Sequence, residues 1–145
     1  MTGRIVDDDG EVARIAGAAK RVAVLGIKTE RQRDQPAFYV PEYLHQAGVE
    51  VVPVPVYYPD ATEILGAKVY REVRHVPGDI DILDVFRRPD DLPPHLDDIV
   101  EKKPKVVWLQ SGIRHPGFAK QLADAGIDVV QDRCLMVEHR RGARR

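Results

Sequence analysis

The sequence is poor in the features that mark membrane, secreted and strongly charged proteins. No apolar run approaches the length of a membrane span, and the acidic start, MTGRIVDDDGEVA, lacks the apolar core of a secretion signal. Cys134 is the only cysteine, which excludes an intrachain disulfide and favours a reducing compartment. A net charge of −1 creates no overall field that would attract nucleic acid or a membrane. We therefore expect a cytoplasmic protein with neither kind of partner.

Motifs of catalysis and metal binding are also scarce. The chain has no G-x-G-x-x-G, no Walker A lysine, and no G-x-S-x-G around Ser111, although His115 follows closely. Cys134 and His139 are five residues apart on one predicted helix, where they point in different directions. The histidines are scattered without an H-x-x-x-H pair, so no metal site is expected. These absences favour binding over catalysis.

What the chain does contain is a regular alternation of apolar strands and amphipathic helices. A length of 145 residues indicates one domain, with residues 1–8 and 142–145 as flexible tails. The predicted strands are 22–25, 49–56 (with pairing that stops near Pro53), 79–86, 105–109 and 127–130. The predicted helices are 10–20, from about 38 to 46, 90–103, 115–125 and 134–140.

Strands joined by helical crossovers predict an α/β fold with a doubly wound, five-stranded parallel sheet and helices on both faces. Two strand orders are common for such a sheet, 3-2-1-4-5 and 2-1-3-4-5. In the first order, the ligand crevice opens between the first and fourth strands at their carboxyl ends.

The stretch from Arg21 to Tyr39 has the pattern of an anion site. A buried strand ends at Gly26, a polar loop follows, and a helix begins after Pro36. The glycine allows the backbone to approach a ligand, and the first N–H groups of the helix point at it. The loop also carries Lys28 and Arg31, so we expect a ligand that contains phosphate.

Two further loops follow strands at the same predicted edge. Arg87 and Arg88 could both bind phosphate, or one of them could pair with Asp84 or Asp90 and fix the loop, and the sequence leaves both alternatives open. Gln110-Ser111-Gly112 offers an amide, a hydroxyl and a close-approach glycine, or else a simple turn in which Ser111 caps the next helix. An NAD site would need an acidic residue where the second strand ends, and the first acid there is the distant Asp60.

Three segments together resemble a known family. DILDVFRRP (Asp81–Pro89), VVWLQSGIRHP (Val106–Pro116) and DVVQDRCLMVEHRR (Asp128–Arg141) are similar to segments of small, single-domain bacterial CoA-binding proteins. Those proteins are related to the CoA-binding, nucleotide-binding domain of the succinyl-CoA synthetase α subunit. The resemblance runs from about Lys20 to Arg141.

The resemblance implies a Rossmann-like fold with strand order 3-2-1-4-5. It places the diphosphate on the first loop and helix start, the adenosine near the end of the second strand, and pantetheine past strands three and four, in an apolar slot near Phe86 and Trp108. If Cys134 lies near the pantetheine end, a mixed disulfide with CoA is expected. The implied cofactor-binding residues are Gly26, Ile27, Lys28, Thr29, Arg31, Pro36, Ala37, Phe38, Val54, Pro55, Phe86, Arg87, Arg88, Gln110, Ser111, Gly112 and Cys134.

The chain departs from the family pattern in two loops. Lys28 and Thr29 stand where a small, serine-containing loop is usual, and Pro53-Val54-Pro55 replaces an Asn-Pro pair in a chain without asparagine. We predict non-catalytic binding of CoA or an acyl-CoA. The alternatives are an NAD(P)- or other nucleotide-binding enzyme, and a sensor or homo-oligomerisation module on the same fold.

Overall fold

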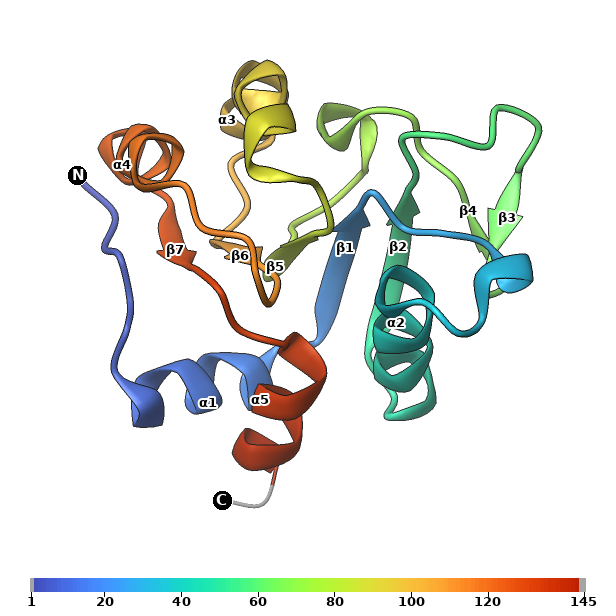
Figure 1. The fold of residues 1–145 in the computed structure, drawn as a ribbon, viewed down its shortest axis with the longest axis horizontal. Coiled ribbons are helices and arrows are strands. Elements are labelled where there is room, and N and C mark those ends of the chain that lie inside the picture. Colours follow the sequence, from blue (N-terminus) through green and yellow to red (C-terminus); the bar gives the residue numbers. More distant parts are fainter. Residues whose placement is uncertain (1, 144–145) are drawn as a thin grey trace.

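A five-stranded parallel sheet forms the centre of the chain in a computed structural model that describes residues 2–143 (Figure 1). Arg144 and Arg145 of the predicted tail lie outside the described residues. The α/β class and the helix-covered parallel sheet predicted from the sequence are confirmed. The sheet strands are Arg21–Leu25 (β1), Glu50–Val54 (β2), Ile82–Val85 (β5), Val106–Leu109 (β6) and Asp128–Val130 (β7).

The order of the strands requires a correction. They run β2-β1-β5-β6-β7, which is 2-1-3-4-5 when the sheet strands are counted along the chain, rather than 3-2-1-4-5. Prolines give a physical reason, because a residue without an N–H is tolerated at a sheet edge and not between two strands. The Val54 carbonyl accepts the Gly26 N–H of the first loop, whereas the Pro53 carbonyl faces away from β1 and accepts the Tyr70 N–H. Pro53 therefore presents its missing donor to the outer edge.

A small hairpin covers that edge. Its strands, Glu63–Ile64 (β3) and Ala67–Lys68 (β4), pair antiparallel, and Figure 1 shows them beside β2. Tyr70, just after β4, makes the hydrogen bond to Pro53 at 3.0 Å. Residues 63–70 thus lie over this edge of the sheet.

Helices cover both faces of the sheet (Figure 1). One buried cluster includes Leu83, Leu109 and Phe118 under α3 and α4, and the other includes Phe38 and Trp108 under α1, α2 and α5. No helix within residues 2–143 has the length and apolar character needed to cross a membrane. The helices are Asp9–Ala18 (α1), Pro36–Gln46 (α2), Leu96–Lys102 (α3), Pro116–Asp124 (α4) and Leu135–Ala143 (α5).

The N-terminal segment from residue 2 onward is not the free tail that the sequence predicts. Ile5 forms a parallel bridge with Val129 of β7, and Val6 is buried. The absence of a side chain at Gly3 makes the close approach possible, since a Cβ there would lie 2.2 Å from the Ile127 carbonyl oxygen. The segment thus extends the sheet beyond β7.

Two helix starts differ from the predictions, and prolines explain both. The helix predicted over 90–103 begins as two 3-10 turns, Pro89–Asp91 and Pro93–His95, and becomes α-helical only at Leu96. α2 begins at Pro36 rather than near Phe38, so Pro41 lies inside the helix. Because Pro41 has no N–H, the Ala37 carbonyl remains available, and it accepts the Lys28 N–H at 3.1 Å. This bond ties the first loop to α2.

Candidate functional site

A cavity of about 470 Å³ opens beyond the carboxyl ends of β5 and β6, beside the starts of α2 and α5. In the observed strand order the switch point lies between β1 and β5, and not between the first and fourth strands as expected from the other order. The cavity is lined by Lys28, Gln35, Pro36, Ala37, Tyr39, Val40, Phe86, Arg87, Arg88, Pro89, Gln110, Ser111, Gly112, Ile113 and Cys134.

Gly26 brings the two loops at the switch point together. Its φ of +87° lies in the region that favours glycine, and a Cβ would stand 2.4 Å from the Phe86 carbonyl oxygen. Gly26 does not line the cavity itself. It allows the loop after β1 to cross directly over the end of β5, which places Lys28 and Arg87 at the same opening.

Lys28 stands at the start of α2 without a carboxylate partner. Its Nζ donates to the Gln35 side-chain oxygen, and no ion pair to it occurs within residues 2–143. Gln35 is the N-cap residue of α2, and its side chain makes no capping hydrogen bond to the first N–H groups of that helix. A helix start without a cap and an ammonium group held by a neutral amide create a positive potential at the cavity mouth.

The two neighbouring arginines have different partners. Arg88 is largely exposed and its Nε lies 3.1 Å from Asp91 Oδ2, so Arg88 pairs with Asp91 instead of Asp84 or Asp90. Arg87 has no carboxylate partner among the described residues; its Nε donates to His95 Nε2 at 3.2 Å. The alternatives that the sequence left open therefore divide between the two arginines: Arg88 fixes its own loop, and Arg87 is available to an anion.

Asp84 is a buried acid one row beneath the cavity floor. It shares a sheet face with Phe86 and lies in register with Val24 and Trp108. Its side chain is fully buried, and neither carboxylate oxygen has a hydrogen-bond partner among residues 2–143. Burial raises the pKa of Asp84 well above its ordinary value.

The loop after β6 is held by the loop after β7. Gln110 Oε1 accepts the Leu135 N–H at 2.9 Å, and the Gly112 N–H donates to Asp132 Oδ1 at 2.7 Å. One interpretation of the sequence proposed that Ser111 caps α4. Ser111 instead lines the cavity. The cap is His115, whose Nδ1 accepts the Phe118 N–H at 3.0 Å, because the Pro116 start leaves that N–H without a helical partner.

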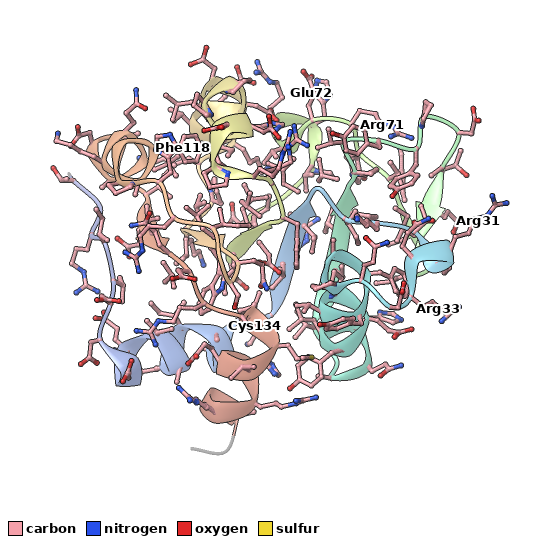
Figure 2. The ribbon with its side chains drawn as sticks, viewed as in Figure 1. Arg31, Arg33, Arg71, Glu72, Phe118 and Cys134 are labelled. Carbon is pink, nitrogen blue, oxygen red and sulfur yellow. The ribbon has the colours of Figure 1, made fainter. Side chains whose placement is uncertain are left out.

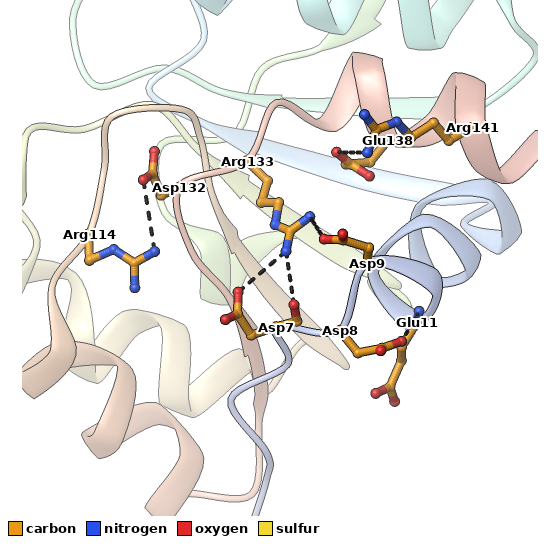
Figure 3. A network of polar contacts seen from close by, with 9 residues as sticks. All are labelled: Asp7, Asp8, Asp9, Glu11, Arg114, Asp132, Arg133, Glu138 and Arg141. Atoms are coloured by element: carbon orange, nitrogen blue, oxygen red, sulfur yellow. Dashed lines mark hydrogen bonds and ion pairs between the residues drawn. The ribbon is translucent and has the colours of Figure 1, made fainter.

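Arg133 fixes Cys134 beside the cavity. Its guanidinium donates to the Asp7 carbonyl at 2.9 Å and approaches Asp9 Oδ1 at 2.8 Å, which joins the N-terminal segment to the start of α5 (Figure 3). Its carbonyl accepts the Trp108 Nε1–H at 2.8 Å. Between these anchors the Cys134 thiol is half-buried, free and part of the cavity wall.

The structure brings most of the predicted site residues together and separates the others. Ile27, Phe38, Val54 and Pro55 are buried away from the cavity surface. Trp108 is also completely buried, so the apolar slot is not formed by its ring. The predicted residues on the cavity wall are Lys28, Pro36, Ala37, Phe86, Arg87, Arg88, Gln110, Ser111, Gly112 and Cys134.

Thr29 and Arg31 lie in a different place. They line a second cavity, of about 470 Å³, together with the Tyr58–Ala61 loop. Thr29 caps a short 3-10 helix, Glu30–Gln32, which turns the chain outward, and Figure 2 shows Arg31 extending away from the sheet. The sequence suggested that Arg31 and Lys28 lie together, and the structure separates them.

Several wall residues were missed from the sequence. Tyr39 and Val40 of α2 lie on the wall, as do Pro89 and Ile113, and none of the four was predicted as a site residue. Gln35 carried one usable signal, since it directly precedes the Pro36 that starts the helix. His95 does not line the cavity but contacts Arg87, and nothing in its local sequence indicates that contact.

Comparisons with known proteins show what the chain is similar to. A family model described as "CoA binding domain" matches residues 20–140. The Bacillus subtilis protein YneT is 32% identical over 129 residues, which cover 89% of this chain and 92% of YneT.

Solved structures extend the comparison. A Thermus thermophilus protein, cell-free ID.343, is 44% identical with a TM-score of 0.83, covering 93% of this chain and 98% of its own. The dinucleotide-forming acetyl-coenzyme A synthetase 1 of Ca. Korarchaeum cryptofilum, solved with phosphate and ADP, has a TM-score of 0.67 over 81% of this chain and 26% of its own. At 19% identity this last likeness concerns the fold alone.

Proposed function

The chain belongs to the CoA-binding domain family, and from this premise we propose that it binds CoA or an acyl-CoA in the cavity at the ends of β5 and β6 without catalysing a reaction. The observation that carries the proposal is the meeting of Lys28 and Arg87 at one opening. Neither cation is neutralised by a carboxylate among the described residues. A diphosphate is the part of CoA that such a pair recognises.

The shape and chemistry of the cavity fit the rest of the ligand. A volume of about 470 Å³ lies within the range of small-molecule sites, roughly 300–1,000 Å³. Apart from Lys28, Arg87 and Arg88, much of the wall is apolar, with Pro36, Val40, Phe86 and Ile113. Such a wall suits the pantetheine arm, which is mostly uncharged and ends in a thiol or thioester close to Cys134.

The use of the histidines supports binding rather than catalysis. Ser111 and Cys134 carry the aliphatic hydroxyl and the thiol on the cavity wall, and a neighbouring base is the common means by which enzymes activate such groups as nucleophiles. His115 uses Nδ1 to cap α4, and His139 Nδ1 lies 2.8 Å from the Tyr43 hydroxyl. No cluster of three or more metal-ligating side chains occurs within the part of the chain that the structure describes.

The dinucleotide alternative has less support. A ribose-binding acid would stand where β2 ends, and that position holds buried Val54 and Pro55. Asp60, the first acid beyond them, lines the second cavity with Thr29 and Arg31. We therefore rank CoA above NAD(P) as the ligand.

Calorimetric titration with CoA tests the proposal. Arg87→Ala removes one charged contact to phosphate, so the affinity should fall about tenfold or more. Lys28→Glu reverses a charge at the helix start and should both weaken binding and flatten its salt dependence. Lys120→Glu is the matched control, since Lys120 is exposed, pairs with Asp124 on α4 and lies outside the cavity wall.

Native mass spectrometry of freshly purified protein adds an independent readout of identity. A co-purified CoA or acyl-CoA mass supports the proposal, and an NAD(P) mass contradicts it. Full CoA affinity in both Arg87→Ala and Lys28→Glu would show that CoA, if bound, lies elsewhere on the chain.

A further inference from the structure

Arg87 is held by uncharged groups on two sides. Its Nε donates to His95 Nε2 at 3.2 Å. On the other side, its guanidinium carbon lies 5.7 Å from the centre of the Tyr57 ring, and Nη1 is 3.5 Å from the Tyr57 hydroxyl. These contacts orient a planar group at the cavity wall and leave its positive charge uncompensated.

His95 can hold Arg87 only while it is uncharged. An arginine Nε–H is always a donor, so the facing His95 nitrogen has to be an acceptor, which fixes the proton of the neutral ring on Nδ1. Protonated histidine donates from both nitrogens and accepts from neither. A proton on Nε2 would therefore abolish this hydrogen bond. Two donors, each on a positively charged group, would then face one another.

The surroundings keep His95 neutral near pH 7. Burial is the largest influence, and together with the Arg87 charge it lowers the pKa of His95 below its usual value near 6.5. Asp98 and Asp91 act in the opposite direction and do not outweigh it. Each already has a basic partner, since Asp98 binds Arg74 at 3.0 Å and Asp91 binds Arg88 at 3.1 Å.

Prolines place His95 at this position. It is the last residue of the 3-10 turn Pro93–His95, and its N–H donates to the Leu92 carbonyl. Leu92 is completely buried and anchors the turn in the core. The ring is thus carried by a turn that is anchored in the core, which suits a group that fixes the position of another side chain.

We propose that His95 is a positioning residue for the anionic ligand: as an uncharged acceptor it holds Arg87 at the cavity, and it releases Arg87 when it gains a proton. The inference rests on the proposed function, since it concerns the grip on CoA phosphate. It makes ligand binding sensitive to pH through a residue that does not line the cavity. Acidification weakens the grip, although protonation adds positive charge to the neighbourhood.

Calorimetry with CoA between about pH 5 and pH 8 tests the proposal, because this interval contains the titration of a histidine. His95→Gln places an amide oxygen near the position of Nε2 and cannot be protonated, so it should retain most of the affinity at every pH. His95→Asn is one methylene shorter and should bind about tenfold more weakly at pH 8, the loss expected for one hydrogen bond to a charged group. His75→Gln is the control, because His75 is exposed and pairs with Glu72.

The ratio of wild-type to His95→Gln affinity cancels the titration of the CoA phosphates themselves. We expect this ratio to fall from pH 8 to pH 5 as His95 gains a proton, and His75→Gln to follow the wild type. A constant ratio would overturn the proposal. A ratio that rises at low pH would overturn it too, because His95 would then act as an additional cation.

Nitrogen NMR of the ligand-free protein separates this inference from the proposed function. The His95 ring should be the Nδ1–H tautomer at neutral pH, and Arg87→Met should raise the pKa of His95 by removing the neighbouring charge. An Nε2–H tautomer would overturn the positioning role. If wild-type protein failed to bind CoA at pH 8, the proposed function would fail, and the NMR titration would still decide whether His95 holds Arg87.

Discussion

Replacing Asp84 with asparagine should stabilise the protein at neutral pH. The carboxyl group is fully buried in β5 between Val24 and Trp108, and neither oxygen has a partner in the described part of the chain. Ionisation there is costly because no hydrogen bond or counter-charge replaces water. The asparagine side chain is similar in size to that of aspartate and cannot ionise.

The pH dependence follows from the direction of the shift. Burial raises the pKa of folded Asp84 above its ordinary value of 3.8, so between the two pKa values the folded chain keeps a proton that the unfolded chain has lost. Raising the pH through this window favours unfolding by about 1.4 kcal/mol for each pH unit. The advantage of Asp84→Asn should be small near pH 4, grow at this rate, and level off above the folded pKa.

Urea unfolding of the wild type and the variant, repeated from about pH 4 to pH 8, measures this difference. Asp81→Asn is the matched control from the segment that leads into the same strand. Partial burial raises the pKa of Asp81, but hydrogen bonds from the Lys20 and Arg21 N–H groups and from Lys105 outweigh it and leave the pKa lowered. Asp81→Asn should therefore destabilise at neutral pH by about 1 kcal/mol, and the loss should shrink as the pH falls below 3.8.

A pH-independent difference between the wild type and Asp84→Asn would refute the reasoning. The reasoning would also be refuted if the stability advantage of Asp84→Asn over the wild type were smaller at pH 7 than at pH 4. Either result would mean that Asp84 does not keep its proton in the folded protein as its burial requires.

Two other predictions concern the cavity. Gly26→Ala should lower the free energy of unfolding by more than about 1 kcal/mol, because Gly26 has a positive φ and a Cβ there would stand 2.4 Å from the Phe86 carbonyl oxygen. The same change should weaken CoA binding. Unchanged unfolding and affinity would contradict the crossing of the two loops. When the protein is incubated with CoA disulfide, the Cys134 thiolate should attack one sulfur and release one CoA thiol, which gives a mixed disulfide. Intact mass with and without reductant would detect it, Cys134→Ser is the control, and no adduct at excess reagent would place the thiol away from the pantetheine end.

The sequence was sufficient for features that depend on local pattern. The β1 run that ends at Gly26, and the loops at Arg87 and Gln110, were predicted at one sheet edge and lie there, because parallel strands leave their carboxyl ends together. The family was also found from sequence, since the three conspicuous segments fall inside the matched residues 20–140, apart from the final Arg141.

Features that depend on which distant segments meet were not predicted. The strand order depends on which strands flank β1. Pro53 carried a signal for this order, because a proline favours a strand at the sheet edge. It was interpreted only as a limit on the pairing of its own strand. The division of roles between Arg87 and Arg88 depended on side-chain direction after the strand end. Arg31 was grouped with Lys28 because both lie in one loop, whereas a 3-10 turn carries Arg31 to a separate cavity.

The crystal structure of the chain with CoA is the measurement that tests the central claim most directly. We predict the diphosphate within hydrogen-bonding distance of Lys28 and Arg87, and the pantetheine arm along Phe86 toward Cys134. A diphosphate bound at Arg31 in the second cavity, with the space beside Arg87 unused, would contradict the account.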